Sequence, residues 1–293
     1  MSIRMPSMLG ACAVVALVGA ATPALVRAQP SAASGEQPAA PMPTPTPVPA
    51  PRRAAVTTSF DMVSAYMFRG IFQEDHGVIA QPLADLGITL MTGEGTLKSV
   101  ATNVGSWSSV HSGPTSTWYE HDFYAGATFT LGRWKPGAMY TSYASPNDRF
   151  NTVHEIAVSL AFDDSAARVP FSPKVLVAFE LDGQADGGQG QGTYLEMGVR
   201  PSFKLSGSSG ISRAIPAKVG LSLRDYYEGA NGSDTFGYVD VGLIAGVPLS
   251  FLPGGSWDLH GGIDVLFLGT ALEAINGGKA VKPVFSIGLG AAF

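Results

Sequence analysis

The chain has 293 residues, a formal net charge of −5, 45% hydrophobic residues and a single cysteine, Cys12. Acids outnumber bases by 23 to 18, which excludes the basic profile typical of a nucleic-acid-binding protein. No apolar run after residue 30 reaches the length of a membrane-spanning helix, so any membrane-crossing hydrophobicity must be distributed differently.

The first 28 residues are predicted to be a secretory signal peptide. Arg4 supplies a short positive region, residues 8–21 are apolar and uncharged, and Ala28 is a suitable small residue before a cleavage site. The alternative, an uncleaved anchor, needs a longer apolar stretch. Cys12 lies too early for a lipoprotein box, so the mature chain would contain no disulfide. Cleavage removes two bases and no acid, which leaves 18 − 2 = 16 bases against 23 acids, a net charge of −7.

Residues 29–54 are predicted to form a Pro-rich periplasmic linker. Proline occupies every second position from Pro41 to Pro49, which favours extended polyproline geometry and offers nothing to bury in a core. We expect a semi-rigid spacer.

From residue 55 onward, apolar residues alternate with polar or small ones, a two-residue period that is typical of β-strands. In residues 281–293 every odd-numbered position is apolar, up to the terminal Phe293. Many of these segments approach the roughly 9–11 residues that a tilted strand needs to cross a bilayer. Twelve segments show the pattern: 55–69, 79–91, 97–107, 118–131, 136–144, 152–162, 172–182, 193–204, 216–227, 236–248, 256–268 and 281–293.

The sequence therefore predicts an all-β fold, a closed antiparallel transmembrane β-barrel of about 12 strands with up-and-down topology, over residues 55–293. The alternative is a soluble β-sandwich or soluble barrel, but sandwich strands are usually only about 5–6 residues long. The signal peptide and terminal Phe293 favour the outer membrane. The last strand should pair with the first, residues 55–69, and remove the exposed edge.

The connections are predicted to alternate between longer external loops and shorter periplasmic turns, with both termini in the periplasm. Residues 205–215 break that rule, which indicates a misplaced strand there. The external loops are short, so a deep plug built from a loop is not expected. The loops are 70–78, 108–117, 145–151, 183–192, 228–235 and 269–280, and the turns are 92–96, 132–135, 163–171 and 249–255.

One segment carries a family resemblance. Residues 64–73 read Ser-Ala-Tyr-Met-Phe-Arg-Gly-Ile-Phe-Gln and resemble the S-x-Y-x-F-R-G-x-x-Q opening of the TorF-family porins. Residues 102–107 and 119–126 are also similar to strands of that family. The resemblance covers about the first half of the barrel, does not include the Pro-rich linker, and implies an outer-membrane barrel with a transport role.

Charged side chains are costly on a lipid-facing surface, so those of the strands are predicted to point into the lumen. The inward bases are Arg69, Lys174, Arg200, Lys218 and Arg224. The inward acids outnumber these bases, and such an excess favours the passage of cations, unless the charges pair across a packed lumen. A barrel of about twelve strands should leave a narrow or partly plugged pore. The inward acids are Asp61, Asp85, Glu120, Asp122, Glu155, Glu180, Asp182, Glu196, Asp240, Asp258 and Asp264.

Arg69 is the most specific candidate. It is expected to end the first strand beside Gly70, where its guanidinium could hold Glu120 or Asp122 bidentately and set a constriction. The alternative is a structural contact that fixes the first external turn, because Gly70 indicates a tight turn.

Two further kinds of site are weighed and set aside. His76 adjoins Glu74 and Asp75, but no fixed ligand spacing is present, and residues 182–187 only partly match a calcium loop, so no metal and no cofactor is predicted. His121 and His154 are expected to face outward, yet no serine stands in a recognisable nucleophile context, so no enzyme is predicted.

The sequence thus predicts a porin-like outer-membrane channel for passive diffusion of small polar or cationic solutes. The alternatives are a non-conducting structural or binding barrel and an outer-membrane lipid-modifying enzyme. The predicted partners are outer-membrane lipids, small solutes and the barrel assembly machinery during insertion, with no nucleic acid.

Overall fold

The structure is a computed structural model that describes residues 53–204, 210–229 and 232–293. The predicted signal peptide and nearly all of the predicted linker lie outside the described residues, as does Cys12.

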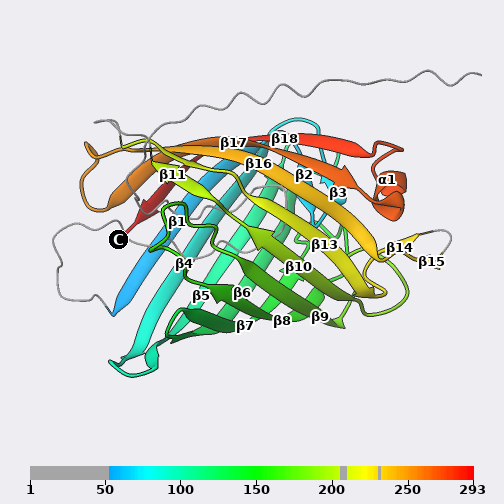
Figure 1. Cartoon of the computed structure of the whole chain (residues 1–293). Coiled ribbons are helices and arrows are strands. Elements are labelled where there is room, and N and C mark those ends of the chain that lie inside the picture. The colour runs from blue at the N-terminus through cyan, green and yellow to red at the C-terminus, as the bar shows by residue number, and fades with distance from the viewer. Residues whose placement is uncertain (1–52, 205–209, 230–231) are drawn as a thin grey trace, which may run out of the picture.

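The described chain forms a closed antiparallel β-barrel of twelve wall strands (Figure 1). The ring closes where β1 pairs with β18, with Thr57–Val63 opposite Ala292–Ser286. β10 and β13 are each extended past a proline by a short strand, β11 and β12. The wall strands in ring order are β1 (Ala54–Val63), β4 (Ile79–Thr92), β5 (Leu97–His111), β6 (Thr117–Leu131), β7 (Trp134–Ala144), β8 (Val153–Phe162), β9 (Lys174–Asp182), β10 (Thr193–Val199) with β11 (Ser202–Lys204), β12 (Ser212–Ala214) with β13 (Ala217–Arg224), β16 (Phe236–Pro248), β17 (Ser256–Leu268) and β18 (Val281–Ala292).

The two-residue period of the sequence sorts the side chains between the two faces of this wall. In β18 the outward Phe285 and Ile287 are each 56% exposed, whereas Lys282 and Val284, which precede them at even-numbered positions, are buried inside. Apolar side chains on the outer face suit a hydrocarbon environment, and charges then collect in the interior. Alternation thus determines both the strand and the direction of each side chain.

The barrel has two unlike ends. The turn end carries the C-terminus and the connections 93–96, 132–133, 163–173 and 249–255. The opposite loop end carries the short hairpin of β14 (Glu228–Gly229) and β15 (Gly232–Ser233) and the single-turn helix α1 (Thr270–Ile275), as Figure 1 shows. α1 buries Ala271 and Leu272 toward the barrel, and Asp234 accepts a hydrogen bond from the backbone N–H of Ala271.

The predicted strand boundaries are wrong at several strand ends, and two of these cases change the course of the chain. The first wall strand ends at Val63 rather than at residue 69, because Ser64 and the residues after it leave the wall for the lumen. The connection expected at 205–215 contains β12, which extends the wall strand of β13 back to Ser212. The rest of that connection, residues 205–209, lies outside the described residues.

Candidate functional site

The segment between β1 and β4 folds into the barrel. β2 (Tyr66–Phe68) and β3 (Ile71–Glu74) pair antiparallel and are joined by Arg69 and Gly70, whose φ angles are +47° and +82°. Two consecutive residues at positive φ match the type I′ turn of tight β-hairpins. We call β2, this turn and β3 the inner hairpin. The expectation that no loop enters the lumen deeply is therefore wrong.

Arg69, at the tip of the inner hairpin, binds the wall on the far side of the lumen. Its guanidinium donates two hydrogen bonds to the carboxylate of Glu155 on β8, at 2.6 and 2.8 Å, and one to the Tyr226 hydroxyl at 2.8 Å. Its Cζ lies 4.4 Å from the ring centre of Tyr194 on β10. β8 and β10 flank β9, which stands opposite β1 in the ring order. The hairpin therefore crosses the whole bore, and the predicted partners Glu120 and Asp122 are wrong.

Close packing fills the space around the hairpin. Tyr66 and Met67 are fully buried, and the Phe68 ring meets the Tyr143 ring edge-on at 5.2 Å. A Cβ at Gly70 would come within 2.6 Å of the Leu272 Cδ1 atom of α1, so glycine is required for this approach as well as for its positive φ. The lumen is thus packed at the loop end.

Acidic side chains of the wall surround the hairpin and are already engaged. The Tyr66 hydroxyl donates to Glu120 at 2.8 Å, and a side-chain hydrogen bond joins Glu120 to Asp122. Glu180 accepts backbone N–H groups of the 183–192 loop, at 2.7 Å from Ala185 and 2.6 Å from Gly192. These contacts order the loop end.

The same pattern continues on the next strands. Glu196 accepts hydrogen bonds from the hydroxyls of Tyr194 at 2.7 Å and Tyr238 at 3.2 Å, and Asp264 is buried on β17. Arg224 lies at the exposed rim, where it donates to the carbonyl of Gln191.

Three of the predicted bases, Lys174, Arg200 and Lys218, lie nearer the turn end and share one side of the barrel. Gly198 of β10 stands in register with Lys174 of β9 and with Lys218 of β13, so the two lysines flank a residue without a side chain. Arg200 lies two residues after Gly198, directly past the end of β10. The ammonium of Lys218 lies 3.8 Å from a carboxylate oxygen of Asp240. These positions are only partly buried, in contrast to the hairpin.

A histidine links two strands across a third, next to the closure of the ring. His260 of β17 places Nε2 2.6 Å from Oδ1 of Asp61 on β1, and Nδ1 2.9 Å from Oδ1 of Asp258. The contact passes over Gly288 of β18, which stands in register between Asp61 and His260. Asp61 and Asp258 were predicted from the alternation, but their pairing through His260 was not.

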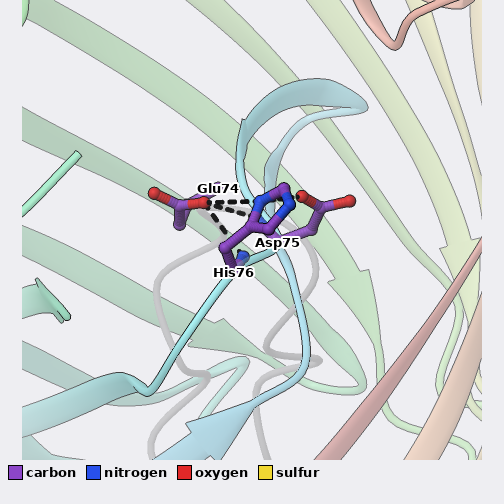
Figure 2. Close-up of side chains that lie close together, drawn as sticks. All are labelled: Glu74, Asp75 and His76. Carbon is purple, nitrogen blue, oxygen red and sulfur yellow. Dashed lines mark hydrogen bonds and ion pairs between the residues drawn. The ribbon is translucent and has the colours of Figure 1, made fainter. Parts of the chain in front are cut away.

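Figure 2 shows Glu74, Asp75 and His76, whose ligand atoms lie within 4.8 Å of one another. Glu74 is occupied by hydrogen bonds from the backbone and hydroxyl of Thr115 and from the backbones of Asp75 and His76. Burial by itself would raise the pKa of Glu74, but these hydrogen bonds outweigh it and lower the pKa to about 2. Asp75 binds Lys282 at 2.6 Å. The cluster anchors a loop, and His76 remains largely exposed.

Sequence reasoning missed the aromatic part of the site. Tyr194, Tyr226, Tyr227 and Tyr238 are fully buried around the tip of the hairpin, and the Tyr227 hydroxyl donates to the carbonyl oxygen of Arg69 at 2.9 Å. Several tyrosines at the loop-end limits of strands were a usable signal, because a buried phenol needs a polar partner.

No helix among the described residues is long and apolar enough to span a membrane. No protein-family profile and no curated protein matches the chain, so the resemblance to the TorF family stays a prediction.

Structural neighbours include outer-membrane β-barrels. The NanC porin matches with 11% identity and a TM-score of 0.42 over 80% of this chain and 98% of its own. The translocator domain of the autotransporter NalP from Neisseria meningitidis has 15% identity, a TM-score of 0.39, and coverage of 82% and 87%. The transport unit of the autotransporter AIDA-I from Escherichia coli has 10% identity and a TM-score of 0.35, over 83% of this chain and 90% of its own. Similarity at this level carries no argument about the solute or the mechanism, which must be argued from the chain's own residues.

Proposed function

We propose that this chain is a non-enzymatic, porin-like channel of the outer membrane for small polar or cationic solutes, and that the inner hairpin closes it. The observation that carries the proposal is the arc of acids on β6 to β10 around the tip of the hairpin, where Arg69 neutralises Glu155. A barrel of about twelve strands is wide enough to hold a bore once nothing fills it.

Displacement of the hairpin determines the sign of the selectivity. Arg69 leaves the lumen together with the hairpin, whereas Glu155 and its neighbours stay on the wall. The loop end of the open bore would then be acidic, and a ring of carboxylates attracts cations and repels anions. The acids concerned are Glu120, Asp122, Glu155, Glu180 and Glu196.

The location and partners follow from the same proposal. The connections at the turn end are mostly short, as periplasmic turns are, so we place both termini in the periplasm. The outer face contacts membrane lipids, the bore admits small solutes, and insertion uses the barrel assembly machinery.

Single-channel recording in planar bilayers tests the proposal. Val63 and Ile79 are paired neighbours in the ladder, so a two-residue Asn-Gly turn can replace residues 64–78 without disturbing the ring. We expect rare openings from the full chain and sustained, cation-selective conductance from the shortened variant. Adding Glu155→Gln to that variant should reduce the cation preference.

A non-conducting barrel is the second candidate, and the tight packing of the inner hairpin favours it. A shortened variant that shows the heat-dependent gel mobility of a folded barrel but no conductance would establish this alternative. Conductance with anion preference would contradict the acidic arc as the element that determines selectivity.

A further inference from the structure

The outer face of the barrel carries one polar region near the loop end, on β5 to β8. Its members point outward, because the residues next to them in each strand, such as Ser109, Glu120 and Glu155, are buried inside. Elsewhere around the loop end the outward positions are apolar and exposed, as with Phe236, Phe267 and Phe285. We call this region the outer histidine patch; it consists of Ser108, His121, Tyr140 and His154.

Both histidines of the patch are held in the same way. The Ser108 hydroxyl lies 2.9 Å from Nδ1 of His121, and the Tyr140 hydroxyl lies 2.8 Å from Nδ1 of His154. In the tautomer that carries the imidazole hydrogen on Nε2, each hydroxyl donates to Nδ1. Each histidine therefore presents an outward N–H donor.

Neither Nε2 atom has a protein partner among the residues that the structure describes. An unpaired donor facing hydrocarbon costs free energy, so such a donor calls for a polar ligand from the membrane side. The depth fits an interface: His154 is the second residue of β8 and His121 the fifth of β6, at about 3.3 Å of strand per residue. Trp118, 47% exposed, meets the His121 ring edge-on at 5.3 Å, as expected at a headgroup boundary.

We propose that the outer histidine patch binds the phosphate of a membrane-lipid headgroup. The two histidines stand on β6 and β8 with β7 between them, and they are offset by two residues along the strands, because His121 pairs with Ala144 and His154 pairs with Ser142. Both therefore lie on one stretch of the outer face, where the phosphate oxygens of a lipid headgroup can reach an imidazole. A phosphate offers only acceptors to them. Arg149, exposed in the loop after β7, donates one hydrogen bond, to the carbonyl of Pro114, and supplies a nearby positive charge at this rim.

Catalysis by Ser108 and His121 is the competing interpretation. A histidine that activates a serine is held by an acceptor on its other ring nitrogen. The described residues place no such group at Nε2 of His121, which therefore suits a ligand contact better than a catalytic base.

Native mass spectrometry of the full chain in detergent micelles tests the site. Dihexanoyl phosphatidic acid is the probe, dihexanoylglycerol is the matched lipid without phosphate, and inorganic phosphate is the third arm. We expect one phosphatidic acid per chain, with at least tenfold weaker binding in the His121→Leu/His154→Leu variant. His76→Ala, an exposed histidine of the loop end, should bind like the unmodified chain.

Leucine is apolar, so the double variant should fold at these outward positions, and heat-dependent gel mobility checks that it does. Equal binding of dihexanoylglycerol would show only an apolar lipid contact and overturn the proposal. Binding of inorganic phosphate without phosphatidic acid, or undiminished binding by the folded double variant, would overturn it as well. These outcomes do not depend on whether the barrel conducts.

Discussion

Arg69 holds a positive charge inside the lumen, against the wall opposite β1, where it is only 4% exposed. Such a charge is tolerated because Glu155 binds it bidentately and aromatic rings cover its faces. The backbone of Arg69 is also at positive φ, which costs free energy in a non-glycine residue. Its side-chain contacts offset that cost, so the turn depends on the ion pair.

Removing one partner of this ion pair should therefore cost more than removing both. We expect Arg69→Met or Glu155→Gln alone to lower the free energy of unfolding by about 3–5 kcal/mol, because each leaves an uncompensated buried polar or charged group. The Arg69→Met/Glu155→Leu double variant should recover part of that loss. Urea unfolding in micelles measures the cycle, and simple additivity of the two single effects would refute the coupling.

Glu74 gives the loop end a dependence on acid. Its pKa in the folded chain, about 2, lies below its ordinary value of 4.5. A depressed pKa means that its contribution is complete above about pH 4.5 and is lost as the pH falls toward 2. We expect the urea midpoint to fall over that window, and Glu74→Gln to be less stable at neutral pH with a flatter acid dependence. Parallel curves for the two chains would count against this role.

At the scale of elements, the ring closure depends on a glycine. A Cβ at Gly288 would overlap Oδ1 of Asp61 and lie 2.5 Å from Nε2 of His260, so Gly288→Ala should break the contact between Asp61 and His260 and destabilise the barrel by about 1–3 kcal/mol. Gly87→Ala is the matched control, since its Cβ would make an ordinary 3.9 Å contact. Unfolding midpoints report the difference, and equal midpoints would mean that the contact is dispensable.

The wall strands were predictable because a lipid-facing surface demands alternation along every one of them. The inner hairpin was not, because residues 65–68 are all apolar and extend the first strand without a polar break, so the sequence did not distinguish a wall strand from a strand inside the barrel. The tight turn of the hairpin depends on positive φ angles at Arg69 and Gly70, and Gly70 was the only residue of the sequence that indicated this turn.

The site was predictable to a similar degree. Strand parity gave the direction of acids such as Glu120 and Asp264, because parity is a property of one strand. Their partners depend on which strands face each other across the closed ring. For that reason the sequence did not predict that Arg69 pairs with Glu155 or that Asp61 pairs with His260.

At the scale of the whole molecule, the outer surface should behave as a lipid contact. Ile287 points outward and is 56% exposed, whereas its neighbour Ser286 points inward. We expect Ile287→Lys to cost about 2–4 kcal/mol and to hinder insertion into vesicles, because a lysine meets hydrocarbon there. Ser286→Lys should insert nearly normally. The folded fraction on unheated gels measures both, and equal insertion would contradict the assigned faces.

The inner hairpin also imposes an order in time. It lies near the start of the barrel sequence, but Tyr226, Tyr238 and Leu272, which enclose its tip, come from the last third of the chain. During synthesis and insertion the tip of the hairpin therefore lacks these contacts until β16, β17 and α1 have folded. Closing the bore is consequently among the last steps of maturation, and a barrel halted before that step would stay unsealed.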